Sequence, residues 1–293
     1  MDMGQRRLGL DRIQVAATLR RLREEAHVTR LQAADALACT LGKISNIETG
    51  VSGIKPAELE KLLDLYGTSA EERAALIETA RASRSRRPRT PHGSLIPTRL
   101  RRMTDLEVQA RAVMFYSPEL IPGVLQTAGY ARALLHGYNH RGDEEVERYL
   151  ALRLQRRRIL DPADGKLPLF QCVLSEAALR SNVGGPTVMH EQLMHLVRRA
   201  EASSNLAIQI LPLGAGAHGL LGVTTTILKF DPPAPDVLHN DIPGRDPLSD
   251  KASEVAAAQG HFEQLQAQAL GKNESLTHIM RVAAEYKELT GSA

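Results

Sequence analysis

Residues 29–50 read TRLQAADALACTLGKISNIETG, and this stretch decides the fold of the first part of the chain. The pattern fits two short helices separated by a three-residue corner. Thr29 and Thr40 are suited to cap the amino ends of these helices, because a threonine hydroxyl accepts a hydrogen bond from a backbone amide of the first turn. The apolar residues of both helices would then line a common core: Ala33, Ala34, Leu37, Ile44 and Ile47.

The outer face of the second helix is small and polar. A helix that is held by its inner apolar side chains and presents such residues outward can enter the major groove of DNA. We expect Asn46 to bind adenine and Lys43 to bind guanine. Gly42 would allow close approach, Leu41 would contact a methyl group, and Arg30 would meet a phosphate. The predicted DNA-binding residues are Arg30, Thr40, Leu41, Gly42, Lys43 and Asn46.

The flanking segments predict three further helices. Apolar residues recur at helical spacing over residues 13–26, and Pro56 suits the first turn of another helix. Ser69 and Glu72 have the spacing of a capping box for a helix that runs to about residue 82. The sequence therefore predicts an all-α head of five short helices, with the second and third in a helix-turn-helix arrangement.

The motif LRRLREEAHVTR…CTLGKISNIETG resembles the phage-repressor-like (XRE) family of helix-turn-helix regulators, over residues 15–66. This resemblance implies DNA binding. The chain departs from the family at two corners, because His27 and Ala38 stand where the family usually has glycine. We expect alanine to be tolerated at residue 38 as long as its backbone dihedral angles stay helical.

Glu48 would face inward, where an unpaired carboxylate is costly. By resemblance to the family, its partner is Arg23. We therefore expect the Arg23–Glu48 pair to hold the fold of the head and not to contact DNA. An ordinary helical bundle, in which the third helix merely packs, is the alternative to a DNA-binding head.

Length and charge indicate two domains. The chain has 293 residues and a formal net charge of +3, but residues 1–102 carry +7 and residues 103–293 carry −4. A basic unit on an acidic remainder is typical of a DNA-binding head joined to a body with another role. We predict a helix-turn-helix domain over residues 1–82, a basic linker over 83–97 and an α+β domain over 98–293.

The predicted linker is rich in arginine, proline and serine. Its composition opposes both helix formation and burial. Two interpretations remain open: a solvated hinge, or a basic arm that lies against DNA phosphates.

The second domain mixes helices and strands. Residues 105–161 are predicted to be helical, and strands are predicted after Pro168, over 206–211 and over 223–230, with a possible short strand over 236–239. Two helices, over 251–270 and 275–289, complete an α+β domain.

Residues 98–290 have a resemblance of their own. The segments PELIPGVLQTAGYARAL, LSEAALRSNVGG, QLMHL, IQILPLGAGAHG and VTTTILKF look like the C-terminal domain of actinobacterial WhiJ-like regulators. That family is described as antitoxin-like, with members often paired to small BldB-like proteins. The resemblance implies that this domain binds such a partner protein. We also expect a homodimer, which would read two half-sites, to be held by the second domain.

No motif for catalysis or metal binding stands out. His136 and His140 have metal-ligand spacing but lie among helix-breaking residues, and Glu176 beside Cys172 lacks a helper histidine. The Gly-rich segment 214–219 fits neither a P-loop nor a Rossmann dinucleotide-binding turn, and it is interpreted as a turn or lid. We expect no enzyme activity, no cofactor and no metal. A ligand-sensing regulator, with a small-molecule pocket in the second domain, is the alternative function.

The predicted location is the cytoplasm. No apolar run reaches the roughly 18 residues of a membrane span, and the amino end lacks the apolar stretch of a signal peptide. Cys39 and Cys172 fall in different predicted domains, so we expect both to be reduced thiols.

Overall fold

The computed structural model describes residues 8–83, 98–138, 142–155, 157, 160, 168–241 and 248–291. The chain divides into two compact units. The first unit runs to Ala110 and includes Phe230–Asp236, and the second comprises Arg111–Lys229 and the residues from Val237 onward. Apart from Ser83, the predicted linker lies outside the described residues, as does His140.

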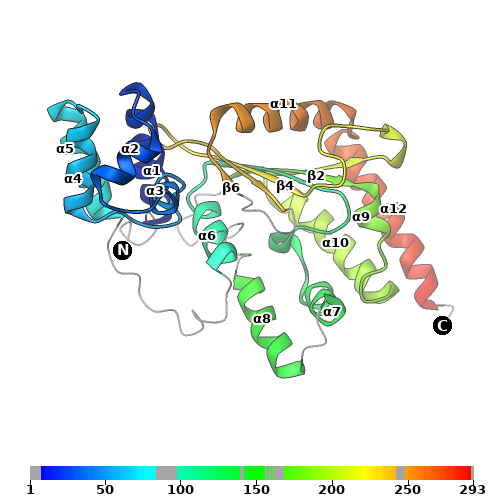
Figure 1. The fold of residues 1–293 in the computed structure, drawn as a ribbon. Helices are drawn as coiled ribbons and strands as arrows, with labels where there is room; N and C mark the ends of the chain where they lie inside the picture. Colours follow the sequence, from blue (N-terminus) through cyan, green and yellow to red (C-terminus); the bar gives the residue numbers. More distant parts are fainter. Residues whose placement is uncertain are drawn as a thin grey trace. The chain divides into compact units, whose positions relative to one another are not determined.

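The first unit contains the predicted head of five helices (Figure 1). They are α1 (Leu8–Glu25), α2 (Arg30–Ala36), α3 (Leu41–Glu48), α4 (Pro56–Leu65) and α5 (Ala70–Ala82). A sixth helix, α6 (Thr98–Glu107), falls in this unit by its contacts, although the predicted second domain begins at residue 98.

Side-chain caps explain where α2 and α3 begin. The Thr29 hydroxyl accepts a hydrogen bond from the amide of Gln32 at 3.2 Å, and the Gln32 side chain accepts one from the amide of Thr29 at 2.8 Å. The Thr40 hydroxyl accepts one from the amide of Lys43 at 3.3 Å. Each cap satisfies an amide that a helix leaves without a partner in its first turn.

The core of the head is made mainly of aliphatic side chains, and all five helices contribute to it. The buried members are Val15, Leu19, Leu22, Ala33, Ala34, Ile44, Ile47, Ile54, Leu59, Leu62, Leu63, Tyr66, Leu76 and Ala80. Because α3 buries Ile44 and Ile47 in this core, its opposite face is turned to solvent.

Both corners next to α2 use a left-handed residue that is not glycine. His27 has a φ of 55° and Ala38 a φ of 49°. Ala38 therefore does not meet the condition of helical dihedral angles under which alanine was expected to be tolerated. The reason is the corner itself: Ala38 donates to the carbonyl of Asp35 and Cys39 donates to that of Ala34, a pattern that requires a left-handed residue just past the helix end.

The second unit is built on a six-stranded mixed sheet with the order β3-β2-β1-β4-β5-β6. The strands are β1 (Ala112–Ser117), β2 (Leu169–Ser175), β3 (Leu206–Leu211), β4 (Thr225–Lys229), β5 (Val237–Asn240) and β6 (Leu248–Ser249). β1, β2 and β3 run parallel, whereas β4, β5 and β6 pair antiparallel. The prediction of helix throughout 105–161 is wrong at β1, which lies in the middle of the sheet.

Helices cover both faces of this sheet. The helices of this unit are α7 (Ala128–Tyr138), α8 (Asp143–Gln155), α9 (Glu176–Arg180), α10 (Pro186–Ala202), α11 (Ala252–Gln268) and α12 (Lys272–Gly291), of which α7 and α8 pack against each other. Figure 1 shows α11 on one face and α10 and α12 on the other. The core between α11 and the sheet contains Met114, Tyr116, Val173, Leu211, Leu220, Ile227, Leu238, Val255, Ala258, Phe262 and Leu265. The fold is thus an all-α head followed by an α+β domain, as predicted.

Candidate nucleic-acid interface

The outward face of α3 and its cap carry the predicted DNA-binding residues other than Arg30, which lies on α2. Thr40, Leu41, Gly42 and Asn46 are exposed, and the Leu41 side chain is 50% exposed although it is apolar. Lys43 is intermediate. A Cβ added at Gly42 would meet only the Thr40 hydroxyl, at 3.9 Å, so this part of the helix is open to a close approach by another molecule.

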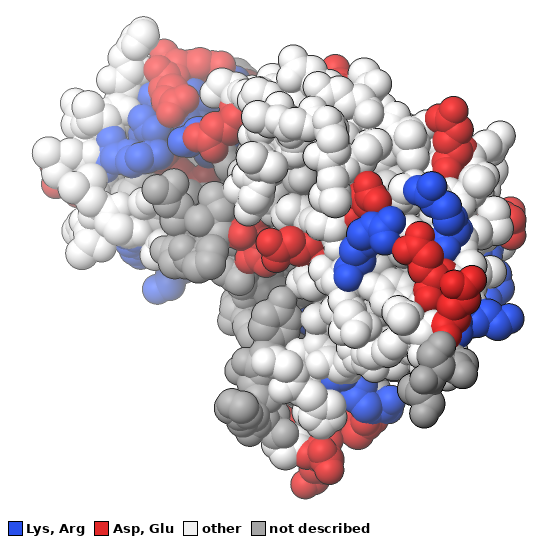
Figure 2. Space-filling model, turned by 90° about the vertical axis from the view of Figure 1, so that its right-hand side faces the viewer, with Lys and Arg blue, Asp and Glu red and all other residues white. Residues whose placement is uncertain are grey.

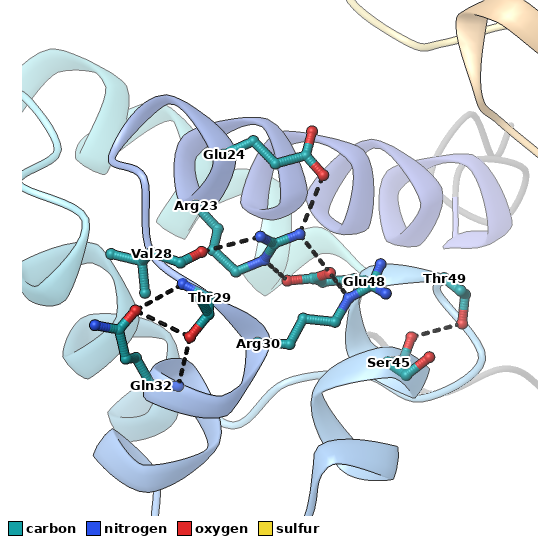
Figure 3. Close-up of polar contacts among 9 residues, drawn as sticks. All are labelled: Arg23, Glu24, Val28, Thr29, Arg30, Gln32, Ser45, Glu48 and Thr49. Atoms are coloured by element: carbon teal, nitrogen blue, oxygen red, sulfur yellow. Dashed lines mark hydrogen bonds and ion pairs between the residues drawn. The ribbon is translucent and has the colours of Figure 1, made fainter.

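Glu48 and Arg23 form the predicted buried pair. Nε of Arg23 lies 2.6 Å from Oε1 of Glu48, and Nη2 lies 3.2 Å from Oε2 (Figure 3). The Arg23 side chain is 9% exposed and that of Glu48 2%. Arg23 also donates to the carbonyl of Val28 at 3.0 Å and to Glu24 at 3.1 Å. These contacts join α1 to the carboxyl end of α3.

Glu48 has a second arginine that the sequence did not reveal. Nε of Arg30, at the start of α2, lies 2.8 Å from Oε2 of Glu48 (Figure 3). The Arg30 side chain remains 47% exposed. Arg30 was predicted to meet phosphate, and it stands on the surface, but it is anchored to a buried carboxylate. Glu48 thus bonds a buried arginine of α1 and a half-exposed arginine of α2.

Lys43 is also paired. Its Nζ lies 2.7 Å from Oε1 of Glu58, in the first turn of α4. The hydrogen bond from Lys43 lowers the pKa of Glu58, and the same bond raises the pKa of Lys43. No local spacing in the sequence signals this contact, because the two residues lie 15 positions apart on different helices.

The candidate catalytic residues of the second unit are engaged in structural contacts. Burial raises the pKa of the Cys172 thiol, which makes it a poor nucleophile. Glu176 accepts hydrogen bonds from Nε of Arg180 at 2.9 Å and from the amide of Leu213 at 3.4 Å. Cys39 and Cys172 are both free thiols.

The Gly-rich segment packs one of its side chains into the sheet. His218 lies edge-on to Tyr116, with Nε2 3.2 Å from the tyrosine hydroxyl, and burial lowers the pKa of the histidine. Across the described ranges, no group of three or more His, Cys, Asp or Glu side chains is arranged to hold a metal ion. In the same ranges, no helix has both the length and the apolar character needed to cross a membrane.

Comparison with known proteins assigns families to both parts of the chain. A helix-turn-helix domain family matches residues 14–76, which contain α2 and α3. No curated protein and no solved structure matched the chain. A second family, described as a domain of unknown function (DUF5753), matches residues 100–281. The chain is therefore a helix-turn-helix DNA-binding regulator that belongs to the DUF5753 family.

Proposed function

We propose that this regulator reads a specific DNA sequence through the outward face of α3. The observation that carries the proposal is that Leu41, Gly42 and Asn46 stand exposed on a helix whose other side is fixed in the core. An α-helix presented in this way fits the major groove, where base edges differ in their hydrogen-bonding groups. The chain would then act as a phage-repressor-like transcription regulator, as the resemblance of residues 15–66 implies.

The proposed contacts divide into two kinds. Asn46 hydrogen-bonds adenine and Lys43 donates to guanine, so these residues select the sequence. Arg30 keeps Nε on Glu48 and turns the rest of its guanidinium group to a phosphate, which positions the head without reading bases.

The test is selection of DNA by the full chain. A pool of random duplexes is bound at low salt, washed at rising salt and sequenced, and the selected duplex is footprinted. The proposal expects one enriched motif, protected in the footprint and lost in Asn46→Ala. A chain that enriches no sequence, or binds all duplexes alike, would overturn it.

We further propose that the second unit binds a small BldB-like partner protein, as in the WhiJ-like, antitoxin-like regulators that residues 98–290 resemble. An uncharged surface supports this proposal. Residues 206–228 contain no Lys, Arg, Asp or Glu, and the loop after β3 exposes Leu213 at 62% and Leu221 at 63%. On the side of the molecule that carries this loop, Figure 2 shows a broad area without charge. Exposed apolar surface of this kind commonly marks a protein interface.

The partner proposal is tested with purified proteins. The full chain is mixed with a BldB-like protein encoded in the same genome, and the complex is measured by light scattering at low and high salt. Binding should survive salt and be lost when Leu213 and Leu221 are both changed to serine. The matched control is Leu289→Ser, because Leu289 is also exposed but lies on α12, outside this loop. If no complex forms while a purified metabolite alters DNA binding, a ligand-sensing function replaces this one.

We also propose that the chain is a homodimer and not an enzyme. Dimerisation would let two heads read two half-sites. The hydrogen bond from Arg180 to Glu176 and the burial of Cys172 support a second unit that binds a partner and does not catalyse a reaction.

A further inference from the structure

The ion pair between Lys43 and Glu58 lies at the proposed DNA-reading helix. Lys43 is three positions before Asn46 on α3, so the two residues share a face of the helix. The Lys43 side chain is 39% exposed and that of Glu58 19%. Glu58 also accepts a hydrogen bond from the amide of Lys55 at 3.4 Å, which fixes its carboxylate at the amino end of α4.

A free lysine at this position would serve sequence selection poorly. Its ammonium group is a compact charge on a flexible stem, and any phosphate of any duplex attracts it. Such attraction strengthens binding to all sequences alike. An ion pair with a fixed carboxylate changes this, because it holds the ammonium in one place and offsets its charge.

The pair still leaves Lys43 able to read a base. The ammonium group has three donors, and the hydrogen bond to Glu58 occupies one of them. The others can reach the O6 and N7 acceptors of guanine, the preferred major-groove partners of lysine. The carboxylate beside it repels phosphate oxygens and so disfavours a shift of the lysine to the backbone.

We propose that Glu58 is a positioning residue for DNA recognition: it holds Lys43 against a base edge and withholds its charge from phosphates. This inference rests on the proposed function of α3 and extends it to a residue of α4. Glu58 thereby acts on sequence preference only through Lys43.

The test uses the full chain and the selected duplex, with every base pair of the site changed in turn. Wild type, Glu58→Gln, Lys43→Met and the double variant are compared. Glu58→Gln should lose about tenfold of preference at the same base pair as Lys43→Met. The double variant should lose no more than Lys43→Met alone. On random-sequence duplex, Glu58→Gln should bind more tightly and its log–log salt slope should steepen by about 0.9.

Two further measurements keep the outcome interpretable. Glutamine also suits the third position of a helix, so Glu58→Gln should unfold cooperatively, which circular dichroism checks. Glu147→Gln breaks the exposed pair with Arg132, 2.6 Å long, and changes the net charge equally, so it controls for charge alone. Unchanged preference in Glu58→Gln at every base pair, or loss at a different base pair from Lys43→Met, would overturn the proposal. If wild type selects no sequence at all, it is the proposed function that has failed.

Discussion

The carboxylate of Glu48 lies 2.6 Å from Nε of Arg23, inside the head, where neither side chain is more than 9% exposed. Each of these buried charges has lost most of its hydration, so its stabilisation depends on the opposite charge of its partner. The pair also bridges the end of α3 to α1, so it connects the proposed DNA-reading helix to the longest helix of the head.

Glu48→Ala should therefore destabilise the head by about 3–5 kcal/mol, since it leaves Arg23 buried without its main partner. Calorimetry of the full chain, with the head transition followed separately from that of the second unit, measures this. Glu147→Ala, which removes an exposed pair, should leave the melting temperature close to that of the parent. A Glu48→Ala head that melts with the parent while losing DNA would mean that Glu48 belongs to the interface instead.

Ala38→Gly should stabilise the head by about 0.5–1 kcal/mol. An L-residue in the left-handed region costs roughly 1–2 kcal/mol, and the extra freedom of glycine in the unfolded chain returns only part of that. Ala74→Gly, on the exposed side of α5, is the control and should destabilise by about 1 kcal/mol. Equal effects of the two substitutions on the melting temperature would show that residue 38 is not strained.

Asn46→Ala should lose roughly 1–3 kcal/mol of discrimination at one base pair and keep its preference elsewhere. Titration of the selected duplex and its single-base variants measures the loss. Asn273→Ala, an exposed asparagine on α12, is the matched control.

Arg30→Ala should weaken binding to every sequence alike and lower the salt slope by about 1, as expected for a lost phosphate contact. Its stability should be compared with that of the parent, because Arg30 also bonds Glu48. A change of sequence preference in this variant would place Arg30 at a base.

The Lys43–Glu58 pair should make a defined contribution to the pH dependence of stability. The pKa of Glu58 is lowered by the lysine, so the contribution is present above the ordinary carboxyl value of 4.5 and is lost as the pH falls through the lowered one. The free energies of unfolding of wild type and Glu58→Gln should therefore differ near neutral pH and converge in acid. A gap that stays constant down to pH 3 would argue against the pair.

Dimerisation has a direct geometric readout. Two heads related by a two-fold axis should protect half-sites about 34 Å apart, one turn of the double helix. Sedimentation at micromolar concentration should give a dimer, and titration should give two chains per duplex. A monomer that binds DNA with one-to-one stoichiometry contradicts this prediction.

Local signals explain how much of the head the sequence predicts. Two signals act within a few residues: the caps at Thr29 and Thr40, and the apolar spacing of α1 to α4. They can therefore be recognised in the sequence before the fold is known. The contacts of Glu48 with Arg30 and of Lys43 with Glu58 join different helices, and their geometry exists only after the helices pack. The handedness of residue 38 was missed because alanine rarely adopts it.

At β1, in the second unit, the local sequence pattern did not predict the structure. Its sequence, AVMFYS, is apolar almost throughout, and its burial alternates little because helices cover both sides of the sheet. A short apolar run without a period of two cannot be told from a buried helix by pattern alone. The strands β3 and β4 were recognised because one alternates and the other is rich in β-branched residues.

The position of α11 late in the chain has a consequence for the order of synthesis. β1, β2, β3 and their connecting helices precede residue 212, so a growing chain holds these strands long before residues 252–268 leave the ribosome. Until then, Met114, Tyr116 and Val173 lack the cover that Val255, Phe262 and Leu265 of α11 provide on that face of the sheet. Ribosome-bound chains that stop before residue 252 should thus expose apolar surface on one face of the sheet. Such chains are prone to aggregate, and they are the species on which chaperones would act.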